Sequence, residues 1–142
     1  MRKNKGFTLV ELLAVLVILA VIGMIAFPLV SNLVSNSEKD AYTQLEKEII
    51  QSAKYYVADN GDDLITIDAT TNAVTHKDCH ITLASLKTKG YLEYQDTIDP
   101  RTDENINNSC VEITYNSSYS QYTYAFKRST TGTCSTKTAC GS

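Results

Sequence analysis

The sequence has few of the residues from which catalytic centres are usually built. Its two histidines, His76 and His80, lie in one short polar stretch. It contains no glycine-rich phosphate loop and no recognisable grouping of a nucleophile, a base and an orienting side chain. The sequence therefore predicts no enzymatic activity and no cofactor.

Charge is absent from one long stretch near the N-terminus. Residues 12–30 are 19 consecutive positions without a charged or strongly polar side chain, and apolar character begins at Phe7. About 18 such residues suffice for a membrane-spanning helix, whereas the core of a secretory signal has roughly 7 to 15. We therefore expect one membrane-spanning helix over residues 7–30. An ordinary signal peptide and a plain anchor without an assembly role are the alternatives.

The chain also lacks an excess of positive charge. It has 13 basic and 16 acidic residues, a net charge of -3, and without Arg2, Lys3 and Lys5 it has 10 basic residues and a net charge of -6. An acidic domain behind a basic leader places the N-terminus in the cytoplasm and the remainder outside. The negative charge argues against broad electrostatic binding of nucleic acid by one molecule.

One charged residue, Glu11, interrupts the apolar segment. An ionised carboxylate in a membrane costs on the order of 2 to 3 kcal/mol unless it is paired. The segment contains no cation, and the nearest one is Lys5, on the other side of Gly6. Cleavage between Gly6 and Phe7 would create an α-amino group at the end of the helix. In a parallel stack of helices, Glu11 of one copy could then meet the amine of Phe7 in the next.

These N-terminal residues closely resemble the signal of type IV pilins and pseudopilins. The resemblance rests on the basic leader MRKNKG, the following FTLVELL with its glutamate in fifth place, the apolar helix and Pro28. It implies a leader over residues 1–6 that a prepilin peptidase removes, and N-methylation of the new terminus at Phe7. It further implies that Glu11 and Pro28 serve assembly.

The resemblance also implies a function, which is that of a structural subunit, a major pilin or pseudopilin, polymerised through its N-terminal helix. The implied partners are further copies, other pilins, the prepilin peptidase, the inner-membrane assembly platform and, before assembly, membrane lipid. The implied location is the cell membrane as a single-pass protein, and then an extracellular filament. A retractile pilus, a type II secretion pseudopilus and a competence filament all remain open. The alternative function is that of a minor pilin that binds DNA, a surface or a secreted substrate.

Residues 31–142 are expected to form a globular head. An amphipathic helix is predicted over residues 38–58 from apolar residues at three- or four-residue spacing, among them Leu45 and Ile49. It continues the membrane segment as one helix, loosened at Gly23 and Pro28, with a length of roughly 75 to 80 Å. Asn60 and Gly61 suit a left-handed cap at its end.

A loop region is expected over residues 59–109. It holds a short strand at 64–68, a turn at 70–72, and a short helix between a cap at Thr82 and Gly90. The motifs GYLEY and IDP, at residues 90–94 and 98–100, resemble pseudopilin-like proteins of Gram-positive bacteria.

A β-hairpin is predicted over residues 110–129, because CVEITYN and QYTYAFK alternate apolar and polar side chains. Its apolar face can cover the stripe of the long helix. A polar tail follows over residues 130–142. The predicted fold class is therefore α+β, with a long N-terminal helix whose second half packs on a small antiparallel sheet, as in pilins.

Four cysteines lie beyond the membrane segment, at Cys79, Cys110, Cys134 and Cys140. An even number in an exported domain indicates two disulfides, with three possible pairings. We favour Cys79 with Cys110, and Cys134 with Cys140. A zinc site at His76, Cys79 and His80 lacks a second ligand pair. Calcium sites are weak alternatives, and no metal is predicted; their candidate ligands are Asp59, Asp62, Asp63, Asp99, Asp103 and Glu104.

Overall fold

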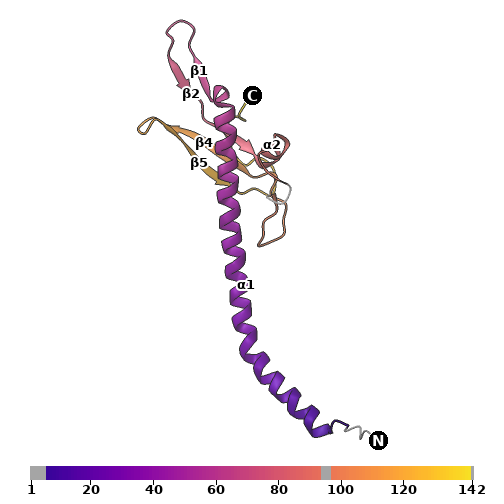
Figure 1. The fold of residues 1–142 in the computed structure, drawn as a ribbon. Helices are drawn as coiled ribbons and strands as arrows, with labels where there is room; N and C mark the ends of the chain where they lie inside the picture. Colours follow the sequence, from indigo (N-terminus) through magenta and orange to yellow (C-terminus); the bar gives the residue numbers. More distant parts are fainter. Residues whose placement is uncertain (1–5, 94–96, 142) are drawn as a thin grey trace, which may run out of the picture. The chain divides into compact units, whose positions relative to one another are not determined.

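The computed structural model describes residues 6–93 and 97–141, so the leader cations and Tyr94 lie outside the described residues. Figure 1 shows the order of the elements along the chain. The chain divides into two compact units, Met1–Glu38 and Lys39–Ser142. One continuous helix, α1 (Leu9–Asp59), passes through both of them.

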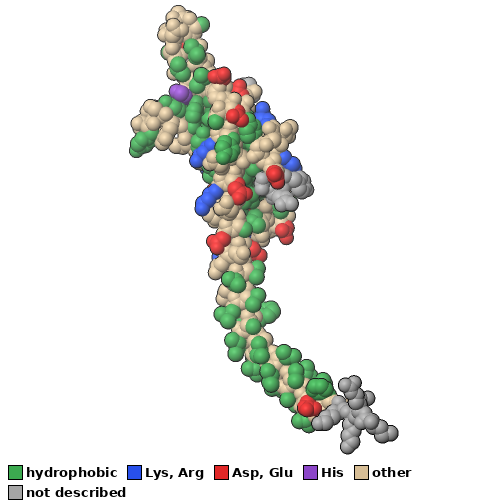
Figure 2. Space-filling view, viewed as in Figure 1, with side chains coloured by type: hydrophobic (Ala, Val, Ile, Leu, Met, Phe, Trp, Pro, Cys, Tyr) green, Lys and Arg blue, Asp and Glu red, His purple; other side chains and the backbone are tan. Residues whose placement is uncertain are grey.

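In the first unit, the surface of α1 is almost entirely apolar. Every described residue up to Ser37 is exposed, and Figure 2 shows hydrophobic side chains along this part of the helix. It is the one helix in the described chain that is long and apolar enough to cross a membrane. The helix continues through Gly23 and Pro28, although a proline has no N–H to donate to the helical ladder.

In the second unit, α1 buries the apolar stripe that the sequence predicts. Ile49, Ala53 and Tyr56 are fully buried, and Leu45 is nearly so. The helix ends at Asp59, and the amide group of Asn60 donates a hydrogen bond to the carbonyl of Tyr56 at 2.9 Å. The left-handed cap expected at Asn60 is wrong, because this residue has φ -124°. Its side chain satisfies the last turn without a left-handed backbone, and Gly61 begins the 3-10 helix η1 (Gly61–Leu64).

Two sheets follow, both antiparallel. The smaller one is the hairpin of β1 (Ile65–Ile67) and β2 (Val74–His76). The larger one has the strand order β3-β4-β5, with β3 (Cys79–Thr82), β4 (Cys110–Asn116) and β5 (Gln121–Lys127). The strand β3 was not predicted from the sequence, because it has only four residues and lies in a polar stretch, although its buried and half-buried side chains alternate.

The larger sheet packs one face against α1. The buried residues Val111 and Ile113 of β4 stand opposite Phe126 and Tyr124 of β5, which are half-buried against the same core. The short helix α2 (Leu83–Thr88) adds Leu83 and Leu86 to this core. It is capped as the sequence predicts, since the hydroxyl of Thr82 accepts from the amide of Ser85, and Gly90 has φ +82°. The α+β class, with a long helix on a small antiparallel sheet, is confirmed.

The disulfides join other cysteines than we favoured. Cys79 is bonded to Cys140, and Cys110 to Cys134. The reason is the register of β3 and β4, in which Cys79 faces Ile113 while Cys110 faces Thr82. Three residues of strand, roughly 10 Å, therefore separate the two positions along the ladder, more than one disulfide bridges. The favoured pairing of Cys79 with Cys110 and Cys134 with Cys140 was wrong.

Candidate functional site

The predicted cleavage site lies just before α1. Gly6 and Phe7 precede α1 and belong to no helix or strand, and Phe7 is 85% exposed. A Cβ atom added at Gly6 would have no neighbour within 4 Å. The backbone around this glycine is thus open within the described chain, as a peptidase substrate requires.

Thr8 and Glu11 form a capping box at the start of α1. One oxygen of the Glu11 carboxylate, Oε2, accepts hydrogen bonds from both the amide and the hydroxyl of Thr8, each at 2.9 Å. The amide of Glu11 in turn donates to the hydroxyl of Thr8 at 3.3 Å. This reciprocal pattern satisfies backbone donors that the first turn of a helix leaves without partners.

Thr8 was not predicted as a partner of Glu11. The apolar segment contains no cation for this carboxylate, and the structure provides a neutral partner three residues earlier. The spacing T-x-x-E directly before an apolar run is the usual signature of a capping box, so the signal was present. Because both hydrogen bonds from Thr8 go to Oε2 of Glu11, the other carboxylate oxygen, Oε1, can still accept hydrogen bonds.

A shallow hollow lies on the side of α1 next to Pro28. Phe27, Val30 and Val34 line its apolar part, together with Ser31, Ser35 and Glu38. All of these residues belong to the first unit, at the spacing of one helix face. The side chain of Phe27 is 81% exposed, so this face is free to contact another apolar surface.

The comparison with family models identifies this N-terminal segment. Residues 1–27 match a model described as the prokaryotic N-terminal methylation motif. The chain carries an N-terminal methylation motif. The matched residues include Gly6, Phe7 and Glu11. No curated protein and no solved structure matches the chain.

The methylation motif fits the first unit of the structure. The matched residues include the first turns of α1, whose exposed apolar part has the length needed for a membrane span. Pro28 lies just beyond the matched residues.

In the second unit, the candidate zinc ligands do not converge. Cys79 forms a disulfide, so its sulfur is not available as a thiolate ligand. His80 Nδ1 lies 2.8 Å from the carbonyl oxygen of Lys137. His76 Nδ1 lies 3.1 Å from the hydroxyl of Tyr122, and its ring stacks on Tyr115. Within residues 6–93 and 97–141, no three metal-ligating side chains form a group.

One candidate calcium ligand, Asp99, has a different role. Its side chain is fully buried, and Oδ2 lies 2.8 Å from Arg101 Nη2 and 3.0 Å from Arg128 Nε. Oδ1 accepts from the amide and the guanidinium of Arg101. The hydrogen bonds from Arg101 outweigh the effect of burial and lower the pKa of Asp99 from 3.8 to about 2. Two guanidinium groups thus occupy the positions that a cation would take.

The Asp99 cluster ties three parts of the second unit together. The guanidinium of Arg101 stacks over the ring of Tyr42 on α1 at 3.3 Å from its centroid. Arg128, just after β5, also pairs with Glu104 at 2.8 Å. The loop that carries Asp99 is therefore fixed to the helix on one side and to the sheet on the other. This cluster was not predicted from the sequence, because Tyr42 and Arg128 lie far from Asp99 along the chain.

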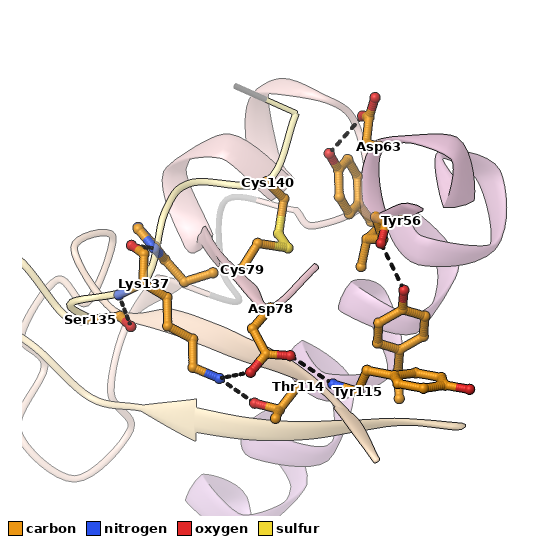
Figure 3. Close-up of a disulfide and its surroundings, with 12 residues drawn as sticks. Tyr56, Asp63, Asp78, Cys79, Thr114, Tyr115, Ser135, Lys137 and Cys140 are labelled. Atoms are coloured by element: carbon orange, nitrogen blue, oxygen red, sulfur yellow. Dashed lines mark hydrogen bonds and ion pairs between the residues drawn. A yellow bond between two sulfur atoms is a disulfide. The ribbon is translucent and has the colours of Figure 1, made fainter. Parts of the chain in front are cut away.

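The C-terminal tail lies on the face of the larger sheet that α1 does not cover. Cys134 is bonded to Cys110 of β4, and the hydroxyl of Ser135 donates to the carboxylate of Glu112 at 2.7 Å. Figure 3 shows the ammonium group of Lys137 directed at Asp78 and at the hydroxyl of Thr114. The tail was predicted as a polar segment, and the structure shows that both disulfides hold it.

Proposed function

We propose that the chain is the precursor of a structural subunit of a type IV filament. A prepilin peptidase cleaves it after Gly6, Phe7 is methylated, and residues 7–30 become the core of the polymer. The observation that carries this proposal is the methylation motif at residues 1–27, which extends into the exposed apolar part of α1.

Glu11 changes its partner during assembly. In the single chain its carboxylate is held by Thr8 through Oε2. In the polymer, the free amine of Phe7 from a neighbouring copy supplies the positive charge that the segment lacks. A carboxylate near a helix N-terminus is also favoured by the helix dipole. The capping box then keeps the side chain in position until a neighbour arrives.

The exposed helix passes from lipid to protein surroundings. Its side chains are matched to the apolar core of a membrane before assembly, and afterwards to the same surface of other copies or other pilins. The hollow next to Pro28, lined by Phe27, Val30 and Val34, provides room for a neighbouring helix. An assembly platform in the cell membrane brings the copies together.

The head, residues 31–142, forms the filament surface outside the cell. Its motifs favour the Gram-positive type of pseudopilin, and its negative charge favours a structural role over DNA binding. A major subunit is our first proposal for it. A minor pilin that contacts DNA, a surface or a secreted substrate is the alternative, and it would be present in few copies per filament.

Three variants test the role of Glu11. We expect Glu11→Ala to reach the membrane but to give few filaments, because an unpaired Phe7 amine remains in an apolar core. Glu11→Gln should fail in the same way, since it keeps the shape and loses the charge. Thr8→Ala removes the cap and keeps the charge, so it should still assemble. The measurement is the amount of this protein in sheared, sedimented filaments, and normal yields from Glu11→Ala would refute the role.

A further inference from the structure

The C-terminal tail covers one edge of the larger sheet, the edge at β3. The amide of His80 in β3 donates to the carbonyl of Thr138, and the amide of Cys140 donates to the carbonyl of His80, each at 2.9 Å. These bonds place Ala139 beside His80 as a parallel bridge. Figure 3 shows the disulfide between Cys79 and Cys140 that closes this edge. The edge at β3 is therefore not open to another strand.

The opposite edge, at β5, is bare. In residues 6–93 and 97–141, no strand pairs with the outer side of Gln121–Lys127. Such an edge offers unpaired N–H and C=O groups unless proline, a bulge or charged side chains guard it. The register with β4 is unbroken, residues 113–126 contain neither proline nor charge, and Lys127 is the last residue of the strand. Most of the β5 edge therefore lacks the proline, bulge or charged side chains that usually prevent another strand from pairing.

The hairpin of β1 and β2 pairs with no third strand among residues 6–93 and 97–141. It has three residue pairs, and a two-stranded hairpin alone is marginally stable in water. Ile67 and Val74 stand opposite each other and are 59% and 55% exposed. The hairpin is held at its base, where His76 stacks on Tyr115 with 3.5 Å between ring centroids. In Figure 1 its turn extends away from the larger sheet.

We propose that the β1–β2 hairpin of one copy adds to the bare edge of β5 in a neighbouring copy. Both surfaces consist of strand backbone. The strands β1, β2 and β5 carry no acidic or basic side chain apart from His76 and Lys127, so no pair of like charges is expected to oppose the contact. The contact would give the hairpin a further strand on one side, and it would thereby support a hairpin that is weak by itself.

This contact joins two different surfaces, so it is heterologous and extends from copy to copy instead of closing into a dimer. That geometry suits a filament. The inference rests on the proposed function only in so far as a filament brings heads of neighbouring copies together. It assigns to the head a direct part in holding the polymer, in addition to the N-terminal helix.

Photo-crosslinking in assembled filaments tests the contact. A photoreactive phenylalanine analogue replaces Val74 in the full chain, and a second copy, marked by Thr123→Ser, is expressed in the same cells. We expect a crosslinked peptide that joins position 74 to residues 121–127 with the mass of the Thr123→Ser variant, which can come only from another copy. The same analogue at Tyr55, which is 57% exposed on α1, is the control and should not reach β5.

Charge placed on the two surfaces gives an independent test. Thr75 and Thr123 are exposed strand residues, and charges interact over about 8 Å at physiological salt, so the test needs no exact register. Thr75→Lys combined with Thr123→Lys should lower the yield of filaments several-fold. Thr75→Lys combined with Thr123→Glu should restore it.

Three results would overturn the inference. They are crosslinks from position 74 only within one chain, crosslinks only to a different protein, and equal yields from the two charge combinations. If the unmodified chain forms filaments and any of these results is found, the hairpin contact fails while the proposed function stands. If the unmodified chain forms no filaments at all, the proposed function fails.

Discussion

Replacing Asp99 by asparagine should destabilise the head strongly at neutral pH and only slightly in acid. The carboxylate is fully buried between the guanidinium groups of Arg101 and Arg128, at 2.8 and 3.0 Å. Its pKa is lowered from 3.8 to about 2, chiefly by the hydrogen bonds from Arg101. At 1.36 kcal/mol for each unit, this corresponds to about 2 kcal/mol of stability.

The sign follows from the direction of the shift. A carboxyl group whose pKa is lower in the folded state stabilises the fold above its unfolded pKa, and this stability is lost as the pH falls through the folded pKa. For Asp99 the window runs from about pH 4 down to about pH 2. Asp99→Asn should thus lower the free energy of unfolding by about 2 to 3 kcal/mol at pH 7 and by less than about 1 kcal/mol at pH 2. The upper end includes the cost of leaving two half-exposed guanidinium groups without their carboxylate.

Urea unfolding at pH 7 and pH 2 measures this difference. The chain has nine tyrosines and no tryptophan, so near-ultraviolet circular dichroism of tyrosine reports the packing of the head. The full chain is kept in one non-ionic detergent throughout. Asp103→Asn is the matched control, because Asp103 is exposed in the same loop and its φ of +54° suits asparagine. A cost that is equal at both pH values, or no larger than that of Asp103→Asn, would refute the reasoning.

Three further predictions concern the termini. Gly6→Leu should leave an uncleaved precursor with an unchanged head, because the position is open within the chain; a mature terminus at Phe7 by mass spectrometry would contradict it. Replacing Cys79 and Cys140 by serine should lower the free energy of unfolding by about 4 kcal/mol, and replacing Cys110 and Cys134 by about 3 kcal/mol, because the first disulfide closes a loop of 61 residues and the second a loop of 24. A lower unfolding midpoint for the second variant than for the first would contradict this. Gly141→Ala should lower the free energy of unfolding by about 1 kcal/mol, because Gly141 has φ +75° and a new Cβ would lie 3.0 Å from a carboxylate oxygen of Asp63. An unchanged unfolding midpoint would contradict this, since it would mean that the tail shifts to accommodate the Cβ.

The parts of the fold that depend on local pattern were predictable. The apolar run, the three- and four-residue spacing of Leu45 and Ile49, and the alternation in β4 and β5 each specify an element through its own sequence. The cap of α2 at Thr82 belongs to the same class, since the cap and its partner are three residues apart. These patterns were enough to place a long helix on an antiparallel sheet.

The parts that depend on distant pairing were not predictable in the same way. The disulfide pairing follows from the register of β3 on β4, and the alternation within β3 covers only four residues, which is too few to identify a strand. The burial of Asp99 depends on Arg128, which is 29 residues away. Thr8 is a different case. Its spacing of three residues to Glu11 is local, so its role as the capping partner of Glu11 was predictable from the sequence.

The mature N-terminus of this chain in surface filaments tests the central proposal most directly. The filaments are sheared from cells and sedimented, and the mass and N-terminal sequence of this protein are determined within them. We predict abundant chain that begins at a methylated Phe7. Full-length chain beginning at Met1 and confined to the membrane fraction would contradict the proposal, and it would leave a membrane-anchored domain with no role in a polymer.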